Sequence, residues 1–333
     1  MRQIILALII STNILFAPRA EANIVVHDFR GKELVLKKPA ERVICLIESA
    51  LTGIYMLQQK NKIIGVPNNV YEEGFYYKGT FAYYALLDER IKNKAIPAVG
   101  NWETVNLEKL ISLKPDLVII WASQSEAIST LERLGIPVYG VFVTKIEDVY
   151  KEIIDFGNLL DSSTRAKQLV SYARDQVSGI KETACNIQSH KRVYFSWAQM
   201  NFLQTSCNGS IVNELIDIFG GKNVCSDIKG ESVTLNIEKL IAFNPDTIFL
   251  WYSKSLTPKD IIQMTSLKTL NAVKNKTVYQ FSDTFSYDLW TLKFIYALKF
   301  MAQKTYPNLF NYNMDDELNN TMKILYKTSF PLN

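Results

Sequence analysis

The chain has 333 residues, of which 48% are hydrophobic, 21% charged and 12% aromatic. This composition excludes intrinsic disorder, a collagen-like fibre and a small disulfide-rich scaffold. Chains longer than about 250 to 300 residues usually divide into more than one domain. The 37 basic and 33 acidic residues give a formal net charge of +4 and are interspersed along the chain, so nucleic acid is not an expected partner.

The first 22 residues predict a secretory signal peptide. Arg2 precedes a wholly apolar run at 4–10, and residues 20–22 (Ala-Glu-Ala) have the small-x-small pattern of a cleavage site. Polar residues at 11–13 interrupt the run, whereas a spanning helix needs about 20 apolar residues. No cysteine follows the run, so we expect cleavage, no lipid anchor and a periplasmic mature protein.

Strand-like and helix-like segments alternate after residue 22. A hairpin is expected over residues 24–37, strands at 43–47, 62–66, 117–121 and 138–143, and helices at 49–58, 107–113, 124–134 and 146–160. Repeated βα units of this kind are typical of a mostly parallel sheet covered on both faces. The pattern predicts an N-terminal α/β lobe over residues 23–161.

A long helix is expected next, over residues 162–186. Its apolar residues recur at three- and four-residue spacing; they are Ala166, Leu169, Val170, Ala173, Val177 and Ile180. So narrow a stripe fits a helix that bridges two lobes. Alternation then restarts, with strands at 192–197 and 247–251 and helices at 210–219, 237–243, 289–305 and 315–326. We expect a C-terminal α/β lobe over residues 187–333.

An internal repeat relates the two lobes. Residues 105–121 (VNLEKLISLKPDLVIIW) and 235–251 (LNIEKLIAFNPDTIFLW) lie 130 positions apart and are identical at eight of 17 positions. The repeat predicts one helix, Pro-Asp turn and strand in each lobe, and its period excludes a short solenoid repeat. Two similar lobes on a bridging helix leave a cleft between them, where ligands of such architectures lie.

Signatures of catalysis and of metal binding are missing from the sequence. It contains no GxGxxG, GxxxxGK[ST], GxSxG or HExxH, so we do not expect an enzyme. His27 and His190 are the two histidines, and neither has a neighbour at metal-ligand spacing. A bare zinc site is therefore not expected, nor is a resident cofactor.

Four cysteines are scattered along the chain without a CxxC pair. Cys45 lies in an apolar run, which predicts a buried free thiol. An even number of cysteines permits disulfides in an oxidising compartment without fixing their connectivity. Cys207 and Cys225 flank one expected helix and are a candidate pair.

Aromatic residues mark the expected cleft. Trp121, Trp197 and Trp251 end predicted strands, and Trp102 precedes the first repeated helix. Because the carboxyl ends of parallel strands face the ligand crevice, these rings are candidate ligand contacts, together with Tyr287. Core packing is the alternative for each ring. Tryptophan walls suit a large, flat or partly apolar ligand. Further tyrosines near the expected cleft are Tyr76, Tyr77, Tyr83 and Tyr84.

Glu108 and Glu238 occupy equivalent places in the two repeats, each in the first turn of its expected helix. A carboxylate at this place is stabilised by the helix dipole and by free N–H groups. The functional interpretation is that the two carboxylates, one per lobe, dock a symmetric basic partner.

These features resemble the periplasmic substrate-binding proteins of ABC importers for metal chelates, the family of ferric-siderophore, haem and cobalamin binders. The resemblance covers about residues 24–310 and is most specific over residues 99–121 (VGNWETVNLEKLISLKPDLVIIW). Residues 42–44, residues 220–224 and the second NxEKL-PD block also match. The resemblance implies two Rossmann-like lobes, a rigid bridging helix and small closure motions on binding.

The resemblance also implies roles for individual residues. Trp102, Trp121 and Trp197 fall where cobalamin-binding members place aromatic ligand contacts. Glu108 and Glu238 fall where family members present glutamates to arginines of the permease dimer in the inner membrane. The implied partners are a metal-chelate ligand and that permease, with the protein itself a monomer.

Departures from the cobalamin binders affect the expected ligand. Ser232 stands where they have a tryptophan, Tyr287 stands where they have an arginine, and a tyrosine-rich insertion at about residues 68–94 has no counterpart. An iron complex such as a ferric siderophore or haem is therefore the expected ligand. Alternative ligands for the same fold are a corrinoid, a nickel chelate or molybdate. Alternative functions from other classes are an exported enzyme that holds a metallocofactor and a ligand sensor that signals to a membrane receptor.

Overall fold

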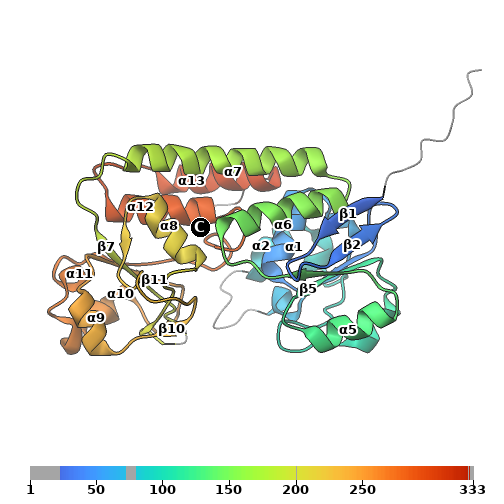
Figure 1. Cartoon of the computed structure of the whole chain (residues 1–333), viewed down its shortest axis with the longest axis horizontal. Helices are drawn as coiled ribbons and strands as arrows, with labels where there is room; N and C mark the ends of the chain where they lie inside the picture. The colour runs from blue at the N-terminus through green and yellow to red at the C-terminus, as the bar shows by residue number, and fades with distance from the viewer. Residues whose placement is uncertain (1–22, 73–79, 200, 329, 331–333) are drawn as a thin grey trace, which may run out of the picture.

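The computed structural model describes residues 23–72, 80–199, 201–328 and 330, and it has two α/β lobes joined by a long helix (Figure 1). Each lobe contains a four-stranded parallel sheet. The N-terminal sheet consists of β4 (Ile63–Gly65), β3 (Val43–Cys45), β5 (Leu117–Trp121) and β6 (Val138–Val141), in that order. The C-terminal sheet consists of β9 (Lys222–Asn223), β7 (Arg192–Ser196), β11 (Thr247–Leu250) and β12 (Val278–Gln280). Both sheets thus have the same strand order, which confirms the predicted fold class.

Helices cover both sheets. In the N-terminal lobe they are α1 (Glu48–Met56), α2 (Thr80–Leu87), α3 (Glu89–Lys92), α4 (Leu107–Ser112), α5 (Ser125–Arg133) and α6 (Ile146–Leu159), with short 3-10 turns η1 (Lys60–Lys62) and η2 (Asn68–Tyr71). In the C-terminal lobe they are α8 (Ile211–Ile218), α9 (Ile237–Phe243), α10 (Pro258–Gln263), α11 (Asn271–Lys274), α12 (Phe294–Thr305) and α13 (Met314–Tyr326), with η3 (Thr265–Leu267). Two small antiparallel sheets, β1 (Ile24–His27) with β2 (Glu33–Leu36) and β8 (Gln204–Thr205) with β10 (Val233–Thr234), complete the described elements.

The bridging helix is α7 (Ser163–Ala184), which runs along one side of both lobes (Figure 1). Five residues of the predicted apolar stripe are buried, and Val177 is partly buried against the same core. The opposite face of α7 is polar and exposed. The periodicity therefore predicted both the helix and the side that it buries.

The repeated Pro-Asp turn has the same structural role in each lobe. Asp116 accepts a hydrogen bond from the backbone N–H of Arg42 at 2.8 Å, and Asp246 accepts one from the N–H of Arg192 at 2.9 Å. Each aspartate thus fixes the start of the neighbouring strand, β3 in one lobe and β7 in the other. This explains why the repeat retains an aspartate at a position remote from the cleft.

The last helix does not stay within the C-terminal lobe. Figure 1 shows α13 alongside α7, and α13 reaches the N-terminal lobe as well. Gln58, just after α1, donates a side-chain hydrogen bond to the carbonyl of Tyr326 at 3.0 Å. Arg165 of α7 donates to the carbonyl of Leu325 at 3.1 Å. The predicted C-terminal segment 187–333 therefore ends on a helix shared between both lobes and the bridge.

Helix α12 begins at Phe294, five residues later than the sequence pattern predicted. Asp283 accepts a hydrogen bond from the N–H of Ser286 at 2.6 Å, and Asp288 accepts one from the N–H of Trp290 at 3.0 Å. Side-chain bonds of this kind hold the backbone in turns and compete with helix formation. The segment between β12 and α12 is consequently a structured loop.

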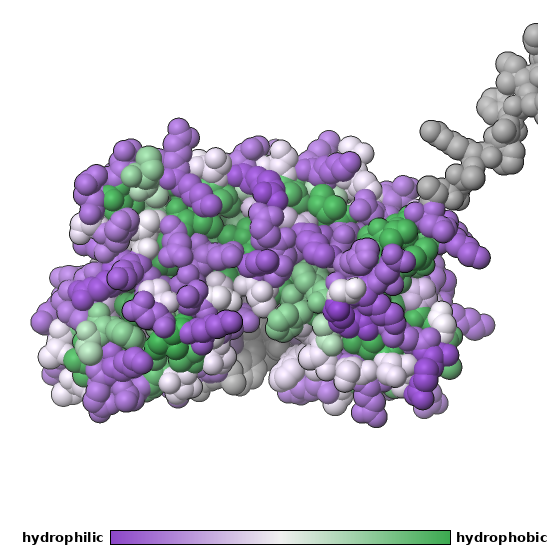
Figure 2. All heavy atoms as spheres, in the orientation of Figure 1, coloured by the Kyte–Doolittle hydropathy of each residue, from purple (hydrophilic) through white to green (hydrophobic). Residues whose placement is uncertain are grey.

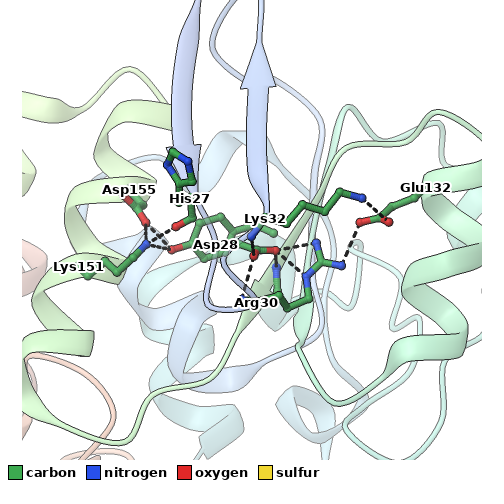
Figure 3. Close-up of polar contacts among 9 residues, drawn as sticks. His27, Asp28, Arg30, Lys32, Glu132, Lys151 and Asp155 are labelled. Atoms are coloured by element: carbon green, nitrogen blue, oxygen red, sulfur yellow. Dashed lines mark hydrogen bonds and ion pairs between the residues drawn. The ribbon is translucent and has the colours of Figure 1, made fainter.

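A polar network attaches the N-terminal hairpin to its lobe (Figure 3). The buried carboxylate of Asp28 accepts hydrogen bonds from the side chain of Arg30 at 2.7 Å and from the N–H of Gly140 on β6 at 3.0 Å. Arg30 and Lys32 both pair with Glu132 of α5, at 2.9 and 2.6 Å. The hairpin that the sequence predicted is thus held by one buried, hydrogen-bonded carboxylate and by ion pairs nearer the surface.

Two of the four cysteines form a disulfide. Cys207 and Cys225 are joined, which is the candidate pairing from the sequence, whereas Cys45 is a buried free thiol and Cys185 an exposed one. Burial raises the pKa of the Cys45 thiol far above its usual range, so Cys45 stays protonated.

Across the described ranges, no helix has both the length and the apolar character needed to cross a bilayer. The predicted leader lies outside the described residues.

Candidate ligand-binding site

A cavity of about 690 Å³ lies between the two lobes, and in Figure 2 the lower edge of the molecule is indented between them. Residues at or beyond the carboxyl ends of the parallel strands line it on both sides. Leu46 follows β3 and Trp121 ends β5 in the N-terminal lobe, and Trp197, Trp251 and Thr284 follow β7, β11 and β12 in the C-terminal lobe. The crevice therefore has the position that parallel sheets give to ligand sites.

All five tryptophans of the chain line this cavity. Trp197 and Trp290 are stacked, with ring centroids 5.8 Å apart and planes at 12°. Trp251 meets Trp197 edge-on at 5.3 Å, and it is only 5% exposed. Trp121 and Trp102 belong to the other lobe, and Trp102 is 58% exposed. The structure thus brings together the four tryptophans predicted from the sequence.

Trp290 is a lining residue that the sequence reasoning missed, because the segment was expected to be helical. The aspartate two positions earlier, a frequent turn former, was the available signal.

Tyr287 is placed differently from the prediction. It is 5% exposed, stacks on Phe281 with centroids 4.6 Å apart, and lies in the hydrophobic core rather than among the cavity-lining residues.

The tyrosines of the insertion were expected near the cleft, and the structure describes two of them. Tyr83 and Tyr84 belong to α2, and Tyr84 lines the cavity. The Tyr84 hydroxyl donates a hydrogen bond to the backbone carbonyl of Glu48 at 2.8 Å. Tyr76 and Tyr77 lie outside the described residues.

Hydrogen bonds fix the aromatic wall of the C-terminal lobe. The indole N–H of Trp197 donates to the Ser206 hydroxyl at 2.8 Å, and that hydroxyl donates to the carbonyl of Glu231. Ser206 follows β8 and precedes Cys207, so the disulfide holds the segment to which the Trp197 indole is bonded. Burial raises the pKa of the Glu231 carboxyl, and a hydrogen bond with the Trp290 side chain partly offsets that rise.

Four polar or charged lining residues lie close together, and we term them the cavity floor: Glu48, Asn69, Asp288 and Lys293. The Asn69 amide donates to the Glu48 carboxylate. The Lys293 ammonium lies 3.5 Å from the Asp288 carboxylate and 3.7 Å from the centroid of the Phe285 ring. Glu48 comes from the N-terminal lobe and the Asp288–Lys293 pair from the C-terminal lobe, so the floor joins both lobes.

The floor carboxyls have perturbed acidities. Burial raises the pKa of Glu48 to about 8; the nearby Asp288 charge adds to the rise, while Lys293 and Asn69 oppose it. Burial also raises the pKa of Asp288 and lowers that of Lys293, and in each case the attraction between the two charges opposes the shift. Such groups respond strongly to any ligand that brings charge or hydrogen-bond donors.

Glu108 and Glu238 are both exposed, in the first turns of α4 and α9. The residue that caps each helix is an asparagine: Asn106 accepts from the N–H of Lys109 at 2.9 Å, and Asn236 accepts from that of Lys239 at 2.8 Å. Neither glutamate has an ion-pair partner within the described part of the chain. Both carboxylates are therefore free to contact another molecule.

Groups of three or more His, Cys, Asp or Glu side chains able to hold a metal ion do not occur in the ranges that the structure describes. The cavity offers aromatic faces and a few charged groups in their place.

Two duplicated parallel-sheet lobes around one aromatic cavity define a substrate-binding protein. The chain belongs to the periplasmic binding protein family, whose pattern matches residues 43–284. This confirms the resemblance inferred from the sequence. The proteins of this family that the chain resembles are substrate-binding components of ABC importers rather than enzymes.

Individual proteins show the same likeness. The chain is 27% identical over 297 residues to an ABC transporter substrate-binding lipoprotein of Bacillus subtilis, which covers 86% of this chain and 87% of that protein. It is 27% identical over 157 residues to the vitamin B12-binding protein of Salmonella paratyphi A, 46% of this chain and 58% of that protein. A periplasmic solute-binding protein from Veillonella parvula superposes with a TM-score of 0.77 at 26% identity, over 93% of this chain and 94% of that one.

Proposed function

We propose that the protein captures a metal chelate with a broad apolar face in the periplasm and delivers it to an ABC importer. The observation that carries this proposal is the convergence of all five tryptophans on one cavity between the lobes. Aromatic walls bind ligands by stacking and by burial of apolar area. The cavity volume of about 690 Å³ lies within the usual range for small-molecule sites.

The sequence favours an iron complex such as a ferric siderophore or haem, with a corrinoid or a nickel chelate as the alternatives. All of these ligands present an organic surface to the tryptophans. Molybdate, the remaining alternative, is a small oxyanion without such a surface. The aromatic wall therefore supports a chelate in preference to an oxyanion.

Delivery requires a surface that the permease recognises, and we assign that role to Glu108 and Glu238. Helices α4 and α9 precede β5 and β11 and run back against them, so their first turns lie at the carboxyl edge of each sheet, where the cavity opens. One exposed carboxylate per lobe matches a two-fold permease that offers a basic group on each side. Export by a leader at residues 1–22, removed by cleavage, places the protein in the periplasm.

Ligand titration of the purified protein tests the proposal. Native mass spectrometry and tryptophan fluorescence would be measured against ferric siderophores, haem, cobalamin, nickel-histidine and molybdate. We expect at least one chelate to bind with a saturable change in emission, because every indole of the chain lines the cavity. Tight binding of free Zn²⁺ or Mn²⁺ without binding of any chelate would contradict the proposal.

A further inference from the structure

The charged residues that line the cavity are predominantly acidic. They are Glu48, Glu103, Glu231 and Asp288, with Lys293 as the basic residue among the described lining positions. Chelates in the classes proposed above differ widely in charge, from trianionic to cationic. The sign of the lining charge is therefore able to discriminate among them.

The single lysine does not balance these carboxylates. Lys293 is almost fully buried and is already engaged by Asp288 on one side and by the Phe285 ring on another. A cation held in this way is not free to pair with an anionic ligand, because its charge is already compensated. Glu48, in contrast, keeps part of its surface exposed and lines the cavity, with the Asn69 amide bound to one of its oxygens.

We propose that the cavity floor selects a neutral or cationic chelate that presents hydrogen-bond donors, and rejects chelates with an anionic edge. This inference rests on the proposed function and narrows its substrate class. Glu48 is the main selecting residue, and the Asp288–Lys293 pair supplies a second acceptor edge from the opposite lobe. The chemical classes that fit are amide-fringed macrocycles and hydroxamate chelates with a free ammonium group.

The physical reason is desolvation. A carboxylate enclosed by a bound ligand loses its water, which is costly unless a donor or a cation replaces that water. An ammonium or amide N–H meets that need at Glu48. A propionate or catecholate oxygen would instead place like charges together in a medium of low polarity. The raised pKa of Glu48 has the same origin, since the free cavity already disfavours the charged carboxylate. The repulsion of anionic ligands therefore acts above about pH 8, and at lower pH a bound cation or donor favours ionisation of Glu48.

Two pairs of probes separate charge from shape in the wild-type protein. Ferrioxamine B, a ferric trihydroxamate with a free ammonium, is compared with a trianionic ferric tris-catecholate. Cobinamide, a corrin fringed by amides, is compared with haem, a macrocycle that carries two propionates. Above pH 8, where Glu48 is ionised, we expect the donor-bearing member of at least one pair to bind more than 10-fold tighter than its anionic counterpart, by calorimetry and fluorescence.

A charge-neutralising variant locates the effect. Measured above pH 8, where the Glu48 carboxyl is ionised, Glu48→Gln should weaken binding of the preferred probe by about 10- to 100-fold, the usual loss when a hydrogen bond to a charged group is removed. Glu182→Gln is the matched control, because it removes the same charge from an exposed position on α7 that does not line the cavity. The control should change the dissociation constant by less than about 3-fold.

The possible results distinguish this inference from the proposed function. Tightest binding of an anionic probe, or equal losses in the two variants, overturns the inference and leaves chelate capture intact. Failure of all four probes and of the wider chelate panel overturns both. If Glu48→Gln does not fold, the order of affinities of the wild-type protein for the four probes still tests the inference.

Discussion

Tyr83 on α2 of the N-terminal lobe stacks on Phe285 of the C-terminal lobe, with ring centroids 4.4 Å apart and planes at 9°. Phe285 in turn covers the Lys293 ammonium and lines the cavity. The stacked pair therefore joins the lobes directly behind the ligand site. A segment that the sequence identified only as a tyrosine-rich insertion contributes to the contact between the lobes.

Removal of the Tyr83 ring should destabilise the protein. Tyr83→Ala loses a stacked pair and partly buried ring area, and we expect the free energy of unfolding to fall by about 2 kcal/mol in urea denaturation. Tyr83→Phe keeps the ring and is the control, with a change of less than about 0.5 kcal/mol. Equal stability of all three proteins would show that the stack does not hold the lobes together.

Trp102 and Trp197 should differ in what they contribute. Trp102→Ala should weaken ligand binding by about 1 to 3 kcal/mol with little change in melting temperature, because that ring is exposed. Trp197→Ala should cost similar affinity and also stability, since it removes the stack on Trp290 and the bond to Ser206. Unchanged affinity in folded Trp102→Ala protein would remove this residue from the site.

The double variant Glu108→Ala with Glu238→Ala should abolish uptake of the ligand by cells while the purified protein binds it with near-normal affinity. Each single variant should lose less than the double. Docking in membranes should weaken as salt rises, because exposed charges are screened beyond about 8 Å at physiological ionic strength. Normal uptake at matched expression would show that both carboxylates only stabilise the first turns of their helices.

The disulfide should stabilise the C-terminal lobe. Reduction, or Cys207→Ser with Cys225→Ser, opens a loop with a sequence separation of 18, for which the expected loss is about 3 kcal/mol. Calorimetry with and without reductant measures this change. Cys185→Ser, which alters an exposed free thiol, is the control and should not shift the melting temperature. A loss of ligand affinity should accompany reduction, because Trp197 is bonded to the residue next to Cys207.

Stability should depend on pH through Glu48. Below about pH 4.5 the carboxyl is protonated in both the folded and the unfolded chain. Between that value and about pH 8 the unfolded chain ionises it while the folded protein keeps the proton, so the free energy of unfolding falls as pH rises and then levels off. Glu48→Gln should show a flatter profile across this window. Identical slopes in the two proteins would contradict the raised pKa.

The positions of residues that carry a local sequence pattern could be predicted. The positions of residues that depend on contacts distant in the sequence could not. The periodicity of α7 and the repeat at 105–121 predicted helices, strands and strand ends, and hence where four tryptophans lie. Tyr287 was predicted to contact the ligand but lies in the core, and Trp290, for which no role was predicted, lines the cavity. The difference arises because hydrogen bonds to Asp283 and Asp288 make the segment before α12 a loop. The short strands β8 and β10 have two residues each, too few for any pattern to show.

The cavity floor had no sequence signal at all. Glu48 and Asp288 lie 240 positions apart and belong to different lobes. Neither is part of the repeat, and their meeting depends on how the lobes are seated against each other. The raised pKa of Glu48 therefore became visible only with the structure.

The contact of α13 with the N-terminal lobe has a consequence for the order in which the lobes are expected to fold. The bond from Gln58 to Tyr326 joins positions 268 apart, so α1 gains its last neighbour only when nearly the whole chain has been synthesised. Contacts so distant in sequence slow folding far more than they reduce stability. We therefore expect that the two lobes, though alike in topology, do not fold one after the other, because the contacts of α1 with α13 form only after the last helix has been synthesised.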